Sequence, residues 1–381
     1  MRINRELLVV AAVFASAFTA VAQQQPVDPI RTPGVQAGRD PNRAAFIAAN
    51  CRTQPAPAAV PAGGANAARG GGAAAGRGGG GAQPAAFENA GVTAIPGVIA
   101  AGQRWRQIWE GSGNNTDSPI ATDRGILLAQ NDLSQIIEIS LDGSVQVIAT
   151  DTYTGGALAL TPNGTLYVGE RALNRGIWQV TPRRLFTNTM NGEPLECLGP
   201  GVLNDMVADK KGGMYMTMGG VYYANAKGVV SGRYGRVGGN GIALSPDDRT
   251  LYVTGRLPGA TLPAGVKLPS GAPEPTGGLV AFDVQPDGSL KNERQFAWAG
   301  NDGTAVDTNG RLYTPGNGGA WVIDPRNGDV LGYFPTPPGT HGLHFGGPNK
   351  RTLFAITLNA QTAVYAIDTL AQGFQVGEWK R

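Results

Sequence analysis

The sequence Asn301-Asp302-Gly303-Thr304-Ala305-Val306-Asp307 leads from polar residues into a short apolar run, and the turn Thr308-Asn309-Gly310 follows it directly. The apolar residues Leu312-Tyr313-Thr314 come next. A short apolar run, a Gly/Asn turn and a second β-rich run together indicate a β-hairpin.

The same sequence pattern recurs along the chain. The residue five positions before each turn serves as a register mark, and the marks are Asp117, Gly156, Asn204, Asn240, Asp302 and His341. Six strand-built repeats spaced roughly 35 to 60 residues apart are typical of a β-propeller. We therefore predict an all-β fold, a six-bladed β-propeller.

The first strand of each propeller blade lines the central channel, so the six marks are expected to form a ring at one end of it. The ring would read Asp, Gly, Asn, Asn, Asp, His, whereas core packing would place Val, Ala or Leu there. Four oxygen-bearing side chains and one imidazole are the composition of a hard-cation site. The alternative is that each Asn or Asp only caps a turn before a strand.

The chain has 381 residues, of which 41% are hydrophobic, enough to bury the core of one large or two ordinary domains. Its formal net charge is +3, and the basic residues form no stripe. We therefore expect no nucleic-acid partner. The partner that we expect is a small-molecule substrate, and the protein is expected to be a monomer.

Residues 1–22 have the features of a secretory signal peptide. Arg2 and Arg5 form a basic start, an apolar run follows, and Ala20-Val21-Ala22 provides a cleavage site before Gln23. The alternative is a membrane anchor, for which the apolar run is short. The sequence thus predicts export to the periplasm or the medium, with no membrane span after cleavage.

Residues 23–86 are rich in Pro, Gly and Ala, apart from a weakly helical patch at Arg43-Ala44-Ala45-Phe46-Ile47. Such a segment buries too little apolar surface to offset its ordering entropy, so we expect a disordered tether before a propeller at residues 87–381. Export would permit a disulfide between Cys51 and Cys197, but two cysteines can also stay free. Because Cys51 falls in the expected tether, we predict that the fold needs no bridge.

Two further strands and one long loop complete the expected fold. A strand at Arg104–Trp109 is predicted to pair with the last blade and so remove an exposed sheet edge. Phe374–Trp379 also alternates like a strand. The Pro- and Gly-rich insertion Arg256–Thr276 is either a lid over one face or an ordinary surface loop.

Several sequence motifs resemble those of the gluconolactonase/regucalcin-type (SGL) family of six-bladed propellers. The matching stretches lie between about Trp105 and Asp368, and they are Leu203–Asp209, Asn240–Asp247, Asp302–Asp307 and Phe345–Pro348. The resemblance implies one divalent cation held by Asp117, Asn240 and Asp302. It implies that Asn204 lies beside them, as a further ligand or as a substrate contact.

This chain departs from the family pattern at two ring positions. The family typically has Glu followed by Gly-Pro where this chain has Asp117, and it often has Asn where this chain has His341. Two carboxylates and two amide oxygens suit Ca²⁺ best, with Mg²⁺ or Mn²⁺ as alternatives. A Zn²⁺ site that uses His341 also stays open.

These residues predict an exported, metal-dependent hydrolase of lactones or related esters. A cation can polarise a lactone carbonyl while a carboxylate activates water, and we assign the carboxylate to Asp302. The chain has no G-x-S-x-G phrase, so a serine hydrolase is not supported. The alternatives are a ligand-binding propeller without catalysis and a metal-dependent lyase or isomerase.

His341 is expected to be a proton shuttle, a substrate contact or a hydrogen-bonded channel residue. His344 is expected to point the other way in the strand and to be packed. The residues expected to contact substrate flank the ring or end second strands, and they are Asn204, Tyr153, Arg171, Arg256 and His341.

Overall fold

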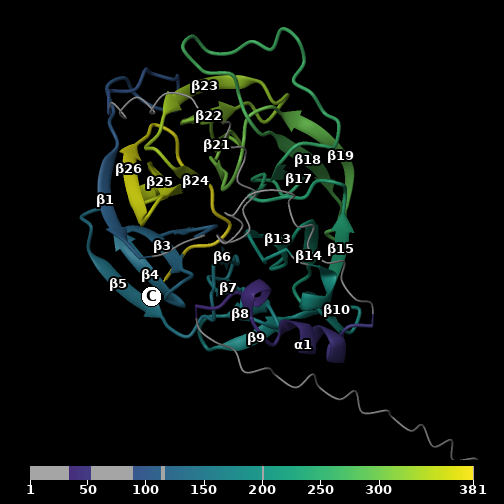
Figure 1. Cartoon of the computed structure of the whole chain (residues 1–381). Helices are drawn as coiled ribbons and strands as arrows, with labels where there is room; N and C mark the ends of the chain where they lie inside the picture. The colour runs from purple at the N-terminus through teal and green to yellow at the C-terminus, as the bar shows by residue number, and fades with distance from the viewer. Residues whose placement is uncertain (1–33, 53–88, 113–115, 200, 381) are drawn as a thin grey trace, which may run out of the picture.

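The structure is a computed structural model that describes residues 34–52, 89–112, 116–199 and 201–380. Six four-stranded antiparallel sheets stand around a central axis, along which Figure 1 is viewed. The prediction of a six-bladed β-propeller is therefore confirmed. The predicted signal peptide and residues 53–86 of the predicted tether lie outside the described residues.

Each blade runs outward from the axis in the order of its strands. Blade 1 consists of β2 (Ile120–Ala121), β3 (Gly125–Gln130), β4 (Gln135–Ser140) and β5 (Val145–Ala149). Blade 2 consists of β6 (Ala157–Leu160), β7 (Leu166–Glu170), β8 (Gly176–Gln179) and β9 (Arg184–Thr187). Blade 3 consists of β12 (Met206–Ala208), β13 (Met214–Thr217), β14 (Val221–Ala224) and β15 (Val230–Tyr234).

The remaining blades follow the same plan. Blade 4 consists of β16 (Ile242–Leu244), β17 (Thr250–Thr254), β18 (Leu279–Val284) and β19 (Leu290–Ala297). Blade 5 consists of β20 (Ala305–Val306), β21 (Leu312–Gly316), β22 (Gly319–Ile323) and β23 (Val330–Pro335). Blade 6 consists of β24 (Thr340–Gly346), β25 (Thr352–Leu358), β26 (Thr362–Asp368) and β1 (Arg106–Gly111).

Apolar side chains between neighbouring blades form the core. The middle strands are buried on both faces, as β3 is at all six of its residues. Between blades 1 and 2, for example, Leu127 and Ile136 pack against Leu158 and Val168, all of them fully buried. Each such side chain contributes about 1.5–3 kcal/mol through the hydrophobic effect. The packing therefore fixes the blades around the axis and so fixes the ring.

The propeller is closed by its N-terminal strand. β1 pairs antiparallel with β26 from Arg106 opposite Ala366 to Gly111 opposite Thr362. The predicted pairing of the N-terminal strand with the last blade is thus confirmed. In the prediction this strand began at Arg104, and the structure begins it at Arg106.

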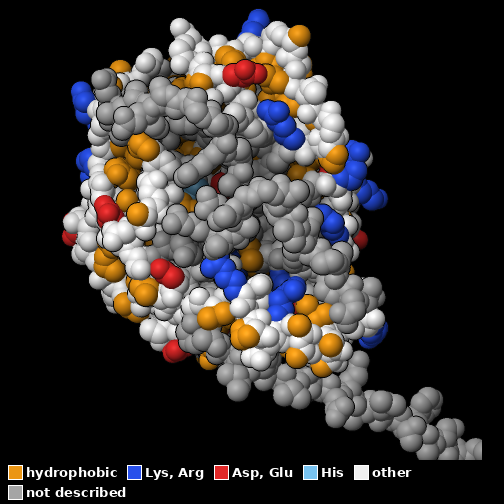
Figure 2. All heavy atoms as spheres, viewed as in Figure 1, with side chains coloured by type: hydrophobic (Ala, Val, Ile, Leu, Met, Phe, Trp, Pro, Cys, Tyr) orange, Lys and Arg blue, Asp and Glu red, His pale blue; other side chains and the backbone are white. Residues whose placement is uncertain are grey.

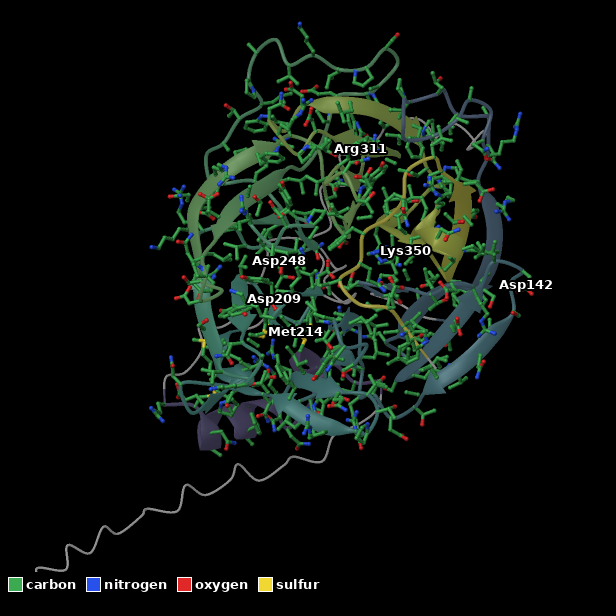
Figure 3. The ribbon with its side chains drawn as sticks, turned by 180° about the vertical axis from the view of Figure 1, so that it is seen from behind. Asp142, Asp209, Met214, Asp248, Arg311 and Lys350 are labelled. Carbon is green, nitrogen blue, oxygen red and sulfur yellow. A yellow bond between two sulfur atoms is a disulfide. The ribbon has the colours of Figure 1, made fainter. Side chains whose placement is uncertain are left out.

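The prediction of a strand at Phe374–Trp379 is wrong, because the last blade already has its four strands. The segment crosses the end of the channel opposite the ring. The Gln375 side chain accepts a hydrogen bond from the Ala121 N–H at 2.7 Å, and the Phe374 N–H donates to the Val306 carbonyl at 2.9 Å. Figure 3 shows this far side, with Lys350 near the yellow C-terminal segment.

Part of the predicted tether is ordered. Residues 34–52 contain η1 (Ala37–Arg39) and α1 (Arg43–Asn50), which lies beside β9 and β10 in Figure 1. Cys51 follows α1 and is bonded to Cys197. The expectation that Cys51 belongs to a disordered segment is therefore wrong.

Blade 2 carries an insertion to which α1 is attached. It comprises β10 (Thr189–Met190), β11 (Glu193–Pro194) and η2 (Leu195–Leu198). Arg43 of α1 forms an ion pair with Glu196 at 2.7 Å, which adds to the disulfide. A further 3-10 turn, η3 (Pro348–Lys350), joins β24 to β25.

The insertion between β17 and β18 contains no helix or strand over residues 256–276. Its two ends reach the ring face, where Arg256 and Gly277 line a cavity. Within the residues that the structure describes, no helix is long and apolar enough to cross a membrane.

Candidate functional site

The six register marks meet at one end of the channel. Five of them precede the first strand of their blade, and His341 is the second residue of β24. The Asp117 N–H donates to the Gly156 carbonyl at 2.8 Å, and the side chains of Asn204 and Asn240 are hydrogen-bonded to each other. His341 Nε2 lies 3.0 Å from the Thr116 carbonyl oxygen. These contacts connect three pairs of neighbouring blades at the ring, namely 1 and 2, 3 and 4, and 6 and 1.

Two more contacts join blade 5 to its neighbours. The Asn240 amide lies 3.5 Å from the Asn301 carbonyl oxygen, and the Leu343 N–H donates to the Gly303 carbonyl at 3.0 Å. Figure 2 shows a histidine in pale blue next to an acidic side chain in red near the centre of this face. The sequence pattern therefore located a set of side chains that are neighbours in space.

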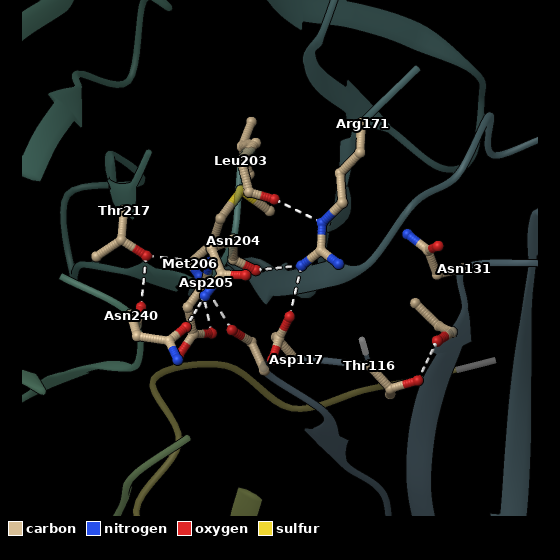
Figure 4. A network of polar contacts seen from close by, with 12 residues as sticks. Thr116, Asp117, Asn131, Arg171, Leu203, Asn204, Asp205, Met206, Thr217 and Asn240 are labelled. Atoms are coloured by element: carbon tan, nitrogen blue, oxygen red, sulfur yellow. Dashed lines mark hydrogen bonds and ion pairs between the residues drawn. The ribbon is translucent and has the colours of Figure 1, made fainter. Parts of the chain in front are cut away.

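Arg171 occupies the place that Gly156 leaves empty in the ring. Its guanidinium lies 2.5 Å from the Asp117 carboxylate and donates to the carbonyls of Leu203 at 2.7 Å and Asn204 at 2.5 Å (Figure 4). Arg171 is only 1% exposed. Sequence reasoning expected a substrate contact at Arg171, whereas the structure makes it a buried partner of Asp117 and joins blade 2 to blade 3 through it.

Asn240 is fixed from two sides. Its carbonyl oxygen accepts a hydrogen bond from the Thr217 hydroxyl at 2.5 Å, and its side-chain Oδ1 accepts one from Asn204. The following residue, Gly241, packs against the backbone of Asp302, where a Cβ would lie 2.4 Å from the carbonyl oxygen. Only glycine therefore allows blade 4 to approach blade 5 this closely.

Asp302 is partly exposed as a residue, but its Oδ1 atom is buried and has no hydrogen-bond partner in the described part of the chain. Burial raises the pKa of Asp302 well above its usual range, and the negative charges of Asp117 and Asp205 add to the increase. A buried carboxylate oxygen without a partner is unfavourable, so it indicates a place for a cation or a proton.

Asp205 is a third carboxylate near the ring, and no site role was predicted for it. Its Oδ1 accepts the Met206 N–H at 3.0 Å and its Oδ2 accepts the Ile242 N–H at 2.9 Å, which joins blades 3 and 4. Burial, followed by the charge of Asp117, raises its pKa well above the usual range. Its position directly after ring residue Asn204 was the only sequence signal for it.

The two histidines differ from expectation in one respect. His344 was predicted to point the other way from His341 and to be packed. Its Nε2 atom is buried, as expected for a packed residue, but the side chain lines the channel cavity beneath the ring. A β-bulge between Thr340 and Gly342 shifts the alternation of β24, which accounts for the error. Burial and the nearby His341 lower the pKa of His344 to about 3, so this ring is neutral.

Two cavities flank the ring. One of about 120 Å³ follows the first strands down the channel and ends at the C-terminal segment around Gln375. The other, of about 460 Å³, lies on the ring face and is lined by glycine backbone together with Asn204, Asn240, Asn301 and Arg256. The second cavity therefore brings a predicted substrate contact, Arg256, to the same space as two ring amides.

Tyr153 contacts residues of blade 2. It is in the loop between β5 and β6, where its carbonyl accepts the Ala172 N–H at 3.2 Å and the Arg183 guanidinium lies 5.6 Å from its ring centre. Both Ala172 and Arg183 lie in loops of blade 2.

No group of three or more His, Cys, Asp and Glu side chains in the described ranges could hold a metal ion. The candidate set instead combines the carboxylates of Asp117 and Asp302 with the amides of Asn204 and Asn240. Oxygen donors of this kind fit a hard cation, and the unpartnered Oδ1 of Asp302 is consistent with that fit.

Comparison with known families gives one match. The model of the family described as SMP-30/Gluconolactonase/LRE-like region matches residues 132–359, more than half of the chain. The comparison with curated proteins gave no match.

The solved structures that resemble the propeller include the following three. A gluconolactonase of Xanthomonas campestris has a TM-score of 0.60 at 21% identity, over 77% of this chain and 99% of that one. A putative gluconolactonase has a TM-score of 0.58 at 19% identity, over 73% and 96%. A calcium-binding regucalcin of Agrobacterium tumefaciens has a TM-score of 0.50 at 17% identity, over 72% and 99%. At such identities the likeness concerns the fold.

Proposed function

Because the chain belongs to the SMP-30/gluconolactonase/LRE-like family, we propose that it is an exported, metal-dependent hydrolase of lactones or related esters. The ring is its proposed active site. The observation that carries the proposal is the buried Oδ1 of Asp302, which has no described partner and lies in a ring of oxygen donors. Two of these donors, Asn204 and Asn240, also line the cavity of about 460 Å³.

The proposed ligands of the cation are Asp117, Asn240 and Asp302, with Asn204 beside them. Asp205 is not included, since both of its oxygens are hydrogen-bonded to backbone N–H groups. Ca²⁺ is the first choice for oxygen ligands, and Mg²⁺, Mn²⁺ and Zn²⁺ are the alternatives. A bound cation would polarise the carbonyl of the substrate and stabilise the negative charge that develops on it.

Asp302 is the proposed general base. It accepts a proton from water as the new carbon–oxygen bond forms at the carbonyl carbon, and the carbon–oxygen bond to the leaving group then breaks. Asp302 returns the proton to the leaving alkoxide, so that one lactone and one water give one hydroxy acid.

His341 is proposed to orient the substrate or to carry a proton. A carbonyl oxygen only accepts hydrogen bonds, so Nε2 must donate to Thr116 and the Nδ1 of a neutral ring is then an acceptor. Nδ1 is buried and has no described partner. A hydroxyl of the substrate or a water molecule would satisfy it.

The cavity suggests a substrate with both apolar and hydrogen-bonding groups. Its walls combine glycine backbone and the side chains of Val202 and Val237 with the amides of Asn204, Asn240 and Asn301. Arg256 is the proposed contact for a negatively charged substituent, and Asn204 the one nearest to the reacting carbonyl. Tyr153 stays a further candidate for a substrate contact.

The test is a hydrolysis assay on metal-stripped protein with sugar lactones, aliphatic lactones and aryl esters. Each would be measured without metal and with Ca²⁺, Mg²⁺, Mn²⁺ or Zn²⁺. We expect hydroxy acid to form from at least one lactone only when metal is present. Binding without turnover would instead favour a ligand-binding propeller, and an eliminated or isomerised product would favour a lyase or isomerase.

A further inference from the structure

One positively charged side chain, that of Arg171, is part of the ring. The guanidinium of Arg171 lies between blades 2 and 3, where it pairs with the Asp117 carboxylate and donates to the carbonyls of Leu203 and Asn204. The Arg171 side chain is fully buried and that of Asp117 is 5% exposed. This buried side chain is not among the residues that line the ring-face cavity, so we argue its effect on the chemistry through its partners Asp117 and Asn204.

Gly156 provides the space for this guanidinium. A Cβ at Gly156 would lie 2.1 Å from Arg171 Cζ and 2.2 Å from its Nη1, closer than any real contact. The guanidinium thus occupies the volume of the missing ring side chain of blade 2. The glycine in the ring motif is explained by the arginine that fills its place.

Arg171 also balances part of the charge at the ring. Asp117, Asp205 and Asp302 lie close enough to interact electrostatically, and Arg171 forms the ion pair with the first of them. A buried carboxylate requires a counter-charge, which Arg171 supplies to Asp117 before any metal binds. The same positive charge repels a second cation held by the same carboxylate.

We propose that Arg171 is a positioning residue that acts as a built-in counter-cation of the ring, holds Asp117 in place without metal, and weakens the binding of a divalent cation. This inference rests on the proposed function, because it concerns the residues proposed to hold the metal. It predicts that the propeller keeps its folded ring when metal is removed and that metal binds and leaves readily.

The test compares Arg171→Met, which removes the charge, with Arg171→Lys, which keeps it. Full-length protein is stripped of metal, and Ca²⁺ affinity is measured by calorimetry alongside the melting temperature with and without Ca²⁺. We expect Arg171→Met to melt lower than wild type without Ca²⁺ and to bind Ca²⁺ at least about tenfold more tightly, so that Ca²⁺ raises its melting temperature more. Arg171→Lys should stay close to wild type in affinity.

A second pair of variants covers the case in which Arg171→Met does not fold. Asp117→Asn leaves Arg171 facing a neutral amide, and Asp117→Asn with Arg171→Met removes both charges. The double variant should bind Ca²⁺ more tightly than Asp117→Asn alone, since the repelling charge is gone. Equal or weaker binding in both comparisons would overturn the proposal and leave Arg171 a purely structural residue.

The outcomes also separate this proposal from the proposed function. If wild type binds Ca²⁺ and hydrolyses a lactone while Arg171→Met gains no affinity, only the role of Arg171 is overturned. If only the Arg171→Met variant binds Ca²⁺, the role of Arg171 is supported and the calcium requirement of the wild type is overturned. If no form binds Ca²⁺, the role of Arg171 is overturned, and the hydrolysis assay decides the proposed function.

Discussion

The disulfide between Cys51 and Cys197 joins the end of α1 to η2, a few residues before ring residue Asn204. The cysteines are 146 residues apart in sequence. A bridge over so long a loop strongly restricts the unfolded chain. The N-terminal segment is therefore part of the folded domain.

Removal of this bridge should lower stability without unfolding the blades. We expect Cys51→Ala with Cys197→Ala to lose about 2–4 kcal/mol, because the unfolded chain gains conformational freedom. The measurement is the melting temperature, with reduced wild type as the control that leaves the sequence unchanged. If the double variant has the same melting temperature as oxidised wild type, the bridge contributes nothing to stability.

Glu196 should make the docking of α1 sensitive to acid. Burial alone would raise the pKa of Glu196, but the charges of Arg175 and Arg43 outweigh it and hold the pKa below its usual range. A carboxyl group whose pKa is lower when folded contributes stability above its unfolded pKa, and the contribution is lost as pH falls through the folded value.

The test compares the melting temperatures of wild type and Glu196→Gln between pH 7 and pH 3. At pH 7 the variant should be less stable by about 3–5 kcal/mol, since Arg175 loses the buried partner to which it lies 2.6 Å away. The difference should shrink below about pH 4.5 as the wild-type carboxylate is protonated. A gap that stays constant to pH 3 would show that the ion pairs are not what stabilises this contact.

Much of the ring was predictable because each blade repeats one local signal. A polar residue, a short strand and a turn specify the position of Asp302 or Asn240 in its own blade, and the propeller then brings these positions together. Prediction of these ring positions therefore required no knowledge of contacts between residues distant in sequence. The closing strand was found in the same way, from its own alternation and the general need to cover a sheet edge.

The errors lie where distant residues decide the outcome. Arg171 enters the ring because Gly156, fifteen positions earlier, leaves room for it, and no local pattern reports that pairing. Residues 34–52 look disordered by composition, yet Glu196 and Cys197 hold them. Phe374–Trp379 alternates like a strand but finds no free edge, because β1 already covers the last blade.

Arg256 should select substrates that carry a negative charge. Its Nε donates to the Gly277 carbonyl, its guanidinium lies 5.5 Å from the ring centre of Trp298, and no described carboxylate forms an ion pair with it. Arg256→Met should raise KM about tenfold or more for lactones with a carboxylate or phosphate group, the effect of losing one charged hydrogen bond.

The same variant should leave kcat/KM for uncharged lactones nearly unchanged. Arg249→Met is the matched control, because Arg249 is exposed at the turn between β16 and β17, away from the ring face. Equal losses on charged and uncharged substrates would refute the assignment. A loss in the Arg249 variant would instead indicate a general effect of charge.

Asp302 and Asp117 should respond differently to the loss of charge. Asp302→Asn keeps the shape of the side chain but removes the proton acceptor, so turnover should fall at least about a hundredfold and should not recover at saturating metal. Asp117→Asn removes a charge but no base, so its defect should be partly recovered by more metal. Asp117→Asn also leaves Arg171 facing a neutral amide, and its folding must therefore be checked first by its melting temperature.

Turnover measured against metal concentration for both variants separates the roles. If both variants recover equally, Asp302 is a ligand and another group takes the proton from water. His341 would then be the next candidate, because its buried Nδ1 has no described partner and lies on the same ring. If both variants stay fully active without added metal, the hydrolysis does not occur at these residues, and the ring serves binding or the packing of the blades.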